Sequence, residues 1–252
     1  MNSYSEIAKS LTQSLRLTQP PVAVCLSGSV PEGVEAWSGH SPAGCLFWQE
    51  AAGRVFATSA ADHGLCSIGL YTHNLEMSLG ASADLGDALK VFADLSYVRE
   101  QDVAAIPVLA SKPKYVIYGP LAEIPVAPDV VLLFVEASQT LILSEASQQL
   151  EGGLPPAMGR PACAIIPQAR NTGRSALSLG CCGARAYLDV LTADIALYAV
   201  PGAAVGAFAE RIAALSGANK VLTKFHQIRR REIEAGKSPT VKESLAALQA
   251  AE

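Results

Sequence analysis

The sequence is poor in charged residues and has no strongly basic segment. Only 17% of its 252 residues are charged, and the net charge is −4. Nucleic-acid-binding proteins usually carry a basic patch, so this composition argues against a polyanionic partner. The one basic cluster, Arg229 to Arg231, is followed by Glu232 and Glu234, which is typical of a solvent-exposed helix face. We therefore expect no nucleic acid among the partners.

Long apolar runs are also missing. The longest dense run, residues 130–135, is far shorter than the ~20 residues that a membrane helix needs. Residues 1–20 contain no apolar stretch and no cleavage-like site of the kind found in secretory signals. We therefore predict a cytoplasmic protein without membrane contact. In a reducing cytoplasm the six cysteines are not expected to form structural disulfides, which leaves metal binding, catalysis or burial.

Familiar catalytic motifs are absent as well. The sequence has no G-x-G-x-x-G after a strand, no P-loop, no G-x-S-x-G, no H-E-x-x-H and no paired acidic metal motif. It also shows no internal repeat, low-complexity tract or domain linker. We expect one domain over residues 1–252, with the C-terminal helices, about 203–252, as an appendage, and a homo-oligomer is compatible with this organisation.

The apolar pattern predicts a layered protein, because half of the residues are hydrophobic. Several runs are apolar on successive residues, which is typical of strands covered on both faces. The predicted strands are 21–27, 55–58, 114–121, 128–136, 175–179 and 195–200, and the predicted helices are 3–17, 82–106, 137–150, 203–215 and 220–252 with a break at 236–239. The predicted fold class is α/β or α+β, with a mixed sheet layered with helices and a C-terminal helical segment.

Five of the six cysteines lie in segments interrupted by glycine, proline or histidine. Cys45 follows Ala43-Gly44 and precedes a helix-like run, and Cys181 and Cys182 lie in L-S-L-G-C-C-G-A-R at 177–185. Helix starts stabilise thiolates, so these are plausible ligand positions. Cys25 instead lies within an apolar strand, where a free cysteine is usually a buried apolar side chain.

These segments resemble an uncharacterised family of bacterial and archaeal proteins with the label ArCR. The likeness extends over roughly residues 15–205 and rests on six segments: P-V-A-V at 21–24, Cys45 before an aromatic pair, H-G-L-C-S-I-G at 63–69, P-D-V-V-L-L-F at 128–134, G-R-P-A-C-A at 159–164 and S-L-G-C-C-G-A-R at 178–185. The resemblance implies that the recurrent cysteines of the family are Cys45, Cys66, Cys163 and Cys181. It favours Cys181 over Cys182 and implies a shared site.

Four cysteines from separate segments are the usual complement of a [4Fe-4S] cluster or a tetrahedral zinc ion. The chain lacks the C-x2–4-C pairs of zinc ribbons, so a cluster is the preferred hypothesis, for electron transfer or cluster-assisted chemistry on a small molecule. A structural zinc-binding module is the alternative. The cysteines could also be ordinary buried core residues without a ligand role. Cys182 and His63 are alternate ligands.

Several neighbours are candidates for the surroundings of this site. Gly64, Gly69, Gly180 and Gly183 would let backbone N–H groups approach the cluster, and Arg160 and Arg185 would compensate its charge or bind a substrate carboxylate. A metal-free enzyme is the third hypothesis, with Cys66 or Cys181 as nucleophile and His63 or His73 as base. No catalytic residue is assigned, and the partner is a small molecule or a redox protein.

Overall fold

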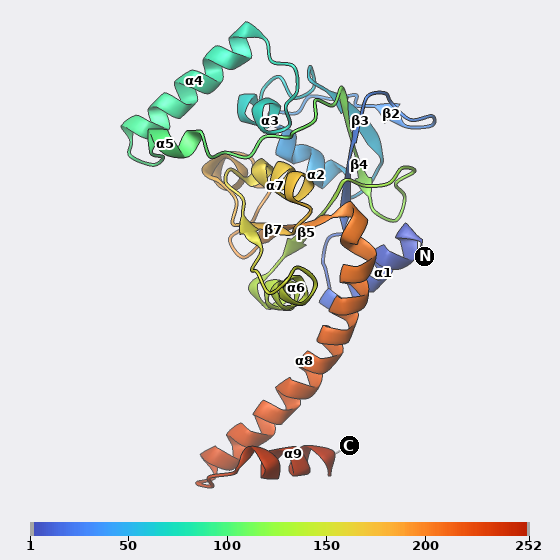
Figure 1. Ribbon diagram of the computed structural model, residues 1–252, viewed down its shortest axis with the longest axis vertical. Helices are drawn as coiled ribbons and strands as arrows, with labels where there is room; N and C mark the ends of the chain where they lie inside the picture. Colours follow the sequence, from blue (N-terminus) through green and yellow to red (C-terminus); the bar gives the residue numbers. More distant parts are fainter. Residues whose placement is uncertain (1–2, 251–252) are drawn as a thin grey trace.

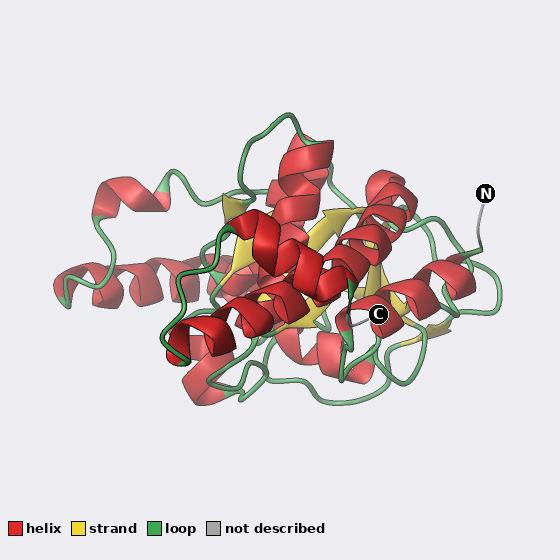
Figure 2. Ribbon diagram, turned by 90° about the horizontal axis from the view of Figure 1, so that it is seen from below, coloured by secondary structure: helices red, strands yellow, loops and turns green. Residues whose placement is uncertain are grey.

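The computed structural model describes residues 3–250 and contains a mixed eight-stranded sheet with helices on both faces (Figures 1 and 2). The strand order is β2-β3-β4-β1-β5-β8-β7-β6. The predicted α/β class with a layered mixed sheet is therefore confirmed. The strands are β1 (Val22–Ser27), β2 (Glu35–Ala36), β3 (Phe56–Ser59), β4 (Tyr115–Pro120), β5 (Val130–Val135), β6 (Ala157–Met158), β7 (Ala176–Ser178) and β8 (Ala196–Pro201).

Nine α-helices are present among residues 3–250, joined by short 3₁₀ turns and one π-helical turn. The α-helices are α1 (Tyr4–Leu15), α2 (Phe47–Glu50), α3 (Ser67–Thr72), α4 (Leu79–Asp94), α5 (Glu100–Val103), α6 (Ala137–Leu150), α7 (Ile165–Thr172), α8 (Val205–Glu234) and α9 (Val241–Gln249). The tight turns that matter for the site are η1 (Gly44–Leu46), η2 (Ala162–Ala164) and the π-helical turn η3 (Gly183–Tyr187).

Three predicted helices have different limits. The single helix expected over 82–106 is wrong, because Ser96 adopts a left-handed φ of 55° and separates α4 from α5. The helices expected at 203–215 and from 220 onward form one 30-residue helix, α8. The predicted break near 236 is confirmed, since Gly236 has a φ of 79° between α8 and α9.

The sheet separates two hydrophobic cores. Alternate residues of a strand point to opposite faces, so Val24 faces one core and its neighbours Ala23 and Cys25 face the other. Helices α2, α3 and α7 cover the first face, and α1, α6 and α8 cover the second. Strands buried on both faces explain why the apolar runs in the sequence do not alternate with polar residues.

The strand order shows an internal repeat that the sequence did not predict. In the first half of the chain, β2 is parallel to β3, β3 is antiparallel to β4, and β4 is antiparallel to β1. In the second half, β6, β7, β8 and β5 pair in the same order and directions. The expectation that the chain has no internal repeat is therefore wrong.

The register of the strands agrees between the two repeats. Val22 opposes Pro120 in the first, and Val130 opposes Pro201 in the second. At the centre of the sheet β1 and β5 are antiparallel, with Ala23 opposite Val131. The sheet therefore has the same strand pairing when it is read from either edge. This is the symmetry of an approximate two-fold axis that passes between β1 and β5.

Two segments extend beyond the repeated core (Figure 1). Helices α4 and α5 are inserted between α3 and β4 and have no counterpart between η3 and β8. The distal part of α8 carries α9, with Phe225 and Leu248 buried between them. The first part of α8 packs on the sheet through Phe208 and Ile212, so the projecting appendage begins later than residue 203. Within residues 3–250, no helix has both the length and the apolar character needed to span a bilayer.

Substitution of Gly202 is predicted to destabilise the fold. A Cβ atom at this position would overlap the carbonyl of Pro128. The Gly202 N–H donates a 2.8 Å hydrogen bond to the neighbouring Asp129 carbonyl, which holds the two segments close together. We expect Gly202→Ala to lower the free energy of unfolding by about 3 kcal/mol, the upper range for overpacking. Urea denaturation measures this change. The control is Gly217→Ala in α8, where no atom lies within 4 Å and alanine should stabilise the helix by up to ~1 kcal/mol.

Candidate metal centre

The two repeats place cysteines at equivalent positions. Cys45 is the middle residue of η1, which leads into α2 after β2. Cys163 is the middle residue of η2, which leads into α7 after β6. Each thiol therefore lies at the first turn of a helical segment, between the two parallel strands of its repeat.

The other two cysteines form a second equivalent pair. Cys66 is the N-cap of α3, after β3, and its carbonyl accepts a 3.0 Å hydrogen bond from Leu70 N–H. Cys181 follows β7, and its carbonyl accepts a 3.0 Å hydrogen bond from Arg185 N–H at the start of η3. The sequence predicted a helix start at Cys181 but not at Cys66, and the pairing of the cysteines between repeats appears only in the fold.

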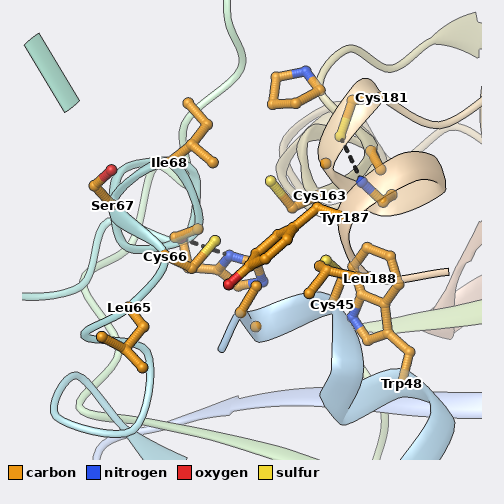
Figure 3. Close-up of a pocket in the computed structure, with 18 residues that line it drawn as sticks. Cys45, Trp48, Leu65, Cys66, Ser67, Ile68, Cys163, Cys181, Tyr187 and Leu188 are labelled. Atoms are coloured by element: carbon orange, nitrogen blue, oxygen red, sulfur yellow. Dashed lines mark hydrogen bonds between the residues drawn. The ribbon is translucent and has the colours of Figure 1, made fainter. Parts of the chain in front are cut away.

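All four cysteines line one cavity of about 200 Å³ on the face of the sheet covered by α2, α3 and α7. Figure 3 shows the four sulfur atoms around a common space, with the ring of Tyr187 lying across it. Tyr187 is 69% exposed, so it lies at the solvent side of the cavity. The structure thus brings together the four cysteines expected to form the site.

The remaining two cysteines lie elsewhere. Cys25 is buried in the core on the opposite face of the sheet, as its apolar strand predicted. Cys182 is exposed and does not line the cavity. Cys181 is therefore better placed than Cys182 to be a ligand.

Burial favours the protonated form of three of the cavity thiols, Cys45, Cys66 and Cys163. Burial, followed by the nearby Cys66 and Cys181, raises the pKa of Cys45 to about 12. The pKa of Cys163 is raised well above its ordinary value, chiefly by burial and then by Cys66. Burial also raises the pKa of Cys66, although the backbone amides of Gly44 and Gly69 counteract it. A bound metal would replace these protons.

Two of the four predicted glycines, Gly69 and Gly183, line the cavity, whereas Gly64 and Gly180 do not. A Cβ atom on Gly69 would lie 3.0 Å from Cys66 Sγ, so a side chain there would crowd the thiol. Gly180 instead serves a turn, with a φ of 89°. Gly44, which precedes Cys45 and was also expected near the cluster, lines the cavity as well, and its Cβ would lie 2.7 Å from His63 Nδ1.

His63 is buried behind the cavity and does not line it. Thr58 Oγ1 donates its one hydrogen to the Val116 carbonyl at 3.1 Å, so His63 Nε2 must donate to Thr58 Oγ1 at 3.0 Å. His63 Nδ1 is then an unprotonated nitrogen without a partner.

His73 is the histidine that lines the cavity. Its Nδ1 atom donates to the Gly69 carbonyl at 2.9 Å, so its Nε2 atom is unprotonated, and Nε2 is buried without a partner. Sequence reasoning considered His73 only as a base. Its position seven residues after Cys66, which is two turns of a helix, was the signal that could have identified it.

The two predicted arginines do not reach the cavity. Arg185 donates to backbone carbonyls of its own loop: Leu179 (2.6 Å), Leu191 (3.4 Å), Thr192 (2.6 Å) and Ile195 (2.8 Å). The guanidinium of Arg160 lies 5.9 Å from the ring centre of Tyr97. Arg185 therefore fixes the loop that carries Cys181, and neither side chain lies beside the thiols.

Unpartnered buried polar atoms concentrate around this cavity. Among residues 3–250, five buried side-chain nitrogen or oxygen atoms have no hydrogen-bond partner. Four of them line or adjoin the cavity: Trp48 Nε1, His63 Nδ1, His73 Nε2 and Tyr118 Oη. Because buried polar groups are normally satisfied, these four atoms leave hydrogen-bonding capacity unused in and beside the cavity.

The donor set suits a guest larger than one ion. Tetrahedral zinc requires sulfur atoms about 3.8 Å apart, as the usual Zn–S bond length implies. In residues 3–250, no three His, Cys, Asp or Glu side chains are grouped closely enough to hold a metal ion. The cysteines instead surround a cavity that exceeds the ~150 Å³ of an engineered cavity that accepts benzene. The four thiols therefore line a space larger than that of a single-ion site.

Comparison with known families assigns the chain. A family model described as uncharacterised ArCR matches residues 10–211. The chain belongs to this family, DUF169. The match includes both repeats and all four cavity cysteines and stops within α8. Comparisons with curated proteins and with solved structures gave no match.

The buried histidines are predicted to make the metal-free protein sensitive to acid. Burial lowers the pKa of His63 to about 3 and that of His73 to about 4, from 6.5. Below pH 6.5 the unfolded chain therefore binds more protons than the folded chain, and stability falls as the pH falls. Between pH 7 and pH 5 we expect a loss of roughly 3 kcal/mol in the free energy of unfolding from this pair.

Urea denaturation of reduced, metal-free DUF169 protein at the two pH values measures this loss. Replacing both buried histidines, in His63→Gln/His73→Gln, should reduce the loss, whereas His226→Gln on the exposed surface of α8 should not. If the wild type and both variants had the same pH dependence, the two buried histidines would not be the cause of the acid sensitivity.

Proposed function

We propose that this DUF169 protein binds a [4Fe-4S]-type cluster through Cys45, Cys66, Cys163 and Cys181. The cluster would serve electron transfer or redox chemistry on a small molecule in the cytoplasm. The observation that carries the proposal is that two repeats each contribute two cysteines, at equivalent positions, to the same cavity.

The equivalence of the cysteines weakens the explanation that they are ordinary core thiols. Some core residues at equivalent places of the two repeats differ strongly in type: Phe56 corresponds to Ala176, and Tyr118 corresponds to Ala199. The four thiols are the same in both repeats while the packing residues around them change. Ligation requires this chemical identity, whereas packing does not.

The surroundings also suit a cluster. Trp48 Nε1–H and Tyr118 Oη–H are unpartnered donors at the cavity, and the sulfur atoms of a cluster accept hydrogen bonds. No Lys, Arg, Asp or Glu lines the cavity. A small-molecule partner at its mouth would therefore meet mostly apolar groups such as Leu65, Ile68 and Tyr187, as would a redox protein.

Anaerobic purification tests the proposal directly. The protein is expected to be brown, with about four iron and four sulfide per chain, as the ligand count implies. Cys45→Ala, Cys163→Ala and Cys181→Ala are expected to lose most of the iron and sulfide. Cys25→Ala and Cys182→Ala are the matched controls and should retain both, because neither thiol lines the cavity.

Two other outcomes would replace the proposal. A colourless protein with one zinc per chain would identify a structural zinc module. A protein without either metal, in which iodoacetamide labels Cys66 or Cys181 much faster than the exposed Cys182, would identify a thiol enzyme.

Gly69→Ala is predicted to separate cluster binding from folding. The alanine Cβ would lie 3.0 Å from Cys66 Sγ and displace the thiol, while alanine within α3 favours the helix by up to ~1 kcal/mol. We expect unchanged or slightly higher stability in urea but reduced iron and sulfide. Gly86→Ala in α4, where no atom lies within 4 Å, should leave the metal content unchanged. Normal iron in Gly69→Ala would show that the position of Cys66 is not constrained.

A further inference from the structure

The two repeats differ in several residues that line the cavity, and one difference concerns a possible metal ligand. Seven residues after Cys66 the chain places His73, and seven residues after Cys181 it places Leu188. Both side chains line the cavity. The repeats thus offer the same thiols to a guest, but only the first offers an imidazole.

His73 and Cys66 are the two cap residues of one short helix. Cys66 precedes α3 and His73 follows it, and both side chains line the cavity, as does Gly69 between them. Helical side chains lean toward the N-terminus of the helix, which directs the imidazole toward the Cys66 end. The two donors therefore face one side of the guest.

The hydrogen bonding of His73 is that of a metal ligand. Its Nδ1–H donates to the Gly69 carbonyl at 2.9 Å, which fixes the tautomer and leaves a lone pair on Nε2. Ligating histidines usually donate their other N–H to a carboxylate or a backbone carbonyl in this way. The imidazole is 2% exposed and Nε2 has no partner, so the lone pair is directed at something other than bulk water.

We propose that His73 Nε2 is a fifth protein ligand at this cavity and would bind the iron on the Cys66 side, so that this one iron would have Cys66, His73 and three sulfides as its ligands. The proposal rests on the cluster proposed above. Cluster sulfides and thiolates present only lone pairs, so they cannot satisfy an unprotonated nitrogen. An iron atom accepts that lone pair. The two repeats together supply four thiolates, one for each iron, and the first repeat adds His73 as a further ligand. The second repeat has Leu188 at the equivalent position and adds no further ligand.

Pulsed electron paramagnetic resonance of the cluster in its paramagnetic state tests this ligation. We expect a strongly coupled nitrogen in the full-length protein. Labelling the histidines with ¹⁵N should replace its ¹⁴N signal with the ¹⁵N signal. The coupling should disappear in His73→Leu, which reproduces the residue of the second repeat, and remain in His226→Leu, where the replaced histidine is exposed on α8.

The internal repeat supplies a second, independent comparison. Cys66→Ala should retain a cluster, because His73 can hold the iron on that side, and its reduction potential should rise, as it does when histidine replaces cysteine in Rieske centres. Cys181→Ala should lose the cluster, because Leu188 has no donor. Cys66→Ala/His73→Leu should lose it as well.

The outcomes separate this inference from the proposed function. A wild-type protein without iron and sulfide overturns both. An intact cluster without a strongly coupled nitrogen, together with equal cluster loss in Cys66→Ala and Cys181→Ala, overturns the ligation by His73 and leaves the cluster proposal standing. Circular dichroism of each variant verifies that it is folded, and the wild-type spectrum decides the ligation even if His73→Leu does not fold.

Discussion

The antiparallel pairing of β1 with β5 is the constraint on which the rest of the structure depends. With Ala23 opposite Val131, the two repeats meet at the centre of the sheet and run in opposite directions. The turns that follow equivalent strands then lie on the same face, where α2, α3 and α7 pack. A slip of one residue in this pairing would exchange the two faces of the strands and separate the repeats. Cysteines that are far apart in the chain are therefore neighbours because of this one pair of strands.

The protein around the cavity favours neutral groups. Cys163 is buried and the other three cavity thiols are partly buried, and the guanidinium of Arg185 is bound to backbone carbonyls of the Cys181 loop. Burial raises the pKa of Cys45, Cys66 and Cys163, so binding of a metal by these thiols would release protons and depend on pH. The helix starts at these three cysteines would favour the deprotonated thiols in a metal-bound protein.

The sequence predicted local structure better than long-range arrangement. The central strands and the helix at 137–150 were predictable because their apolar runs and stop signals are local. The cavity cysteines were identifiable from their loop contexts together with the family resemblance. The repeat was not predictable, since equivalent strands such as β4 (Y-V-I-Y-G-P) and β8 (A-L-Y-A-V-P) share few residues and the insertion of α4 and α5 gives the halves different lengths. His73 was missed because its meaning depends on which face of α3 meets the cavity.

The repeated architecture is the one that results when two copies of a single smaller protein are joined end to end. Each copy alone would carry two thiols, and a complete site would exist only after two such chains had associated. A covalent link turns that association into an intramolecular event with a high effective concentration, so the site forms at any protein dilution. It also frees the halves to diverge, and one of them could then acquire an imidazole without altering the other.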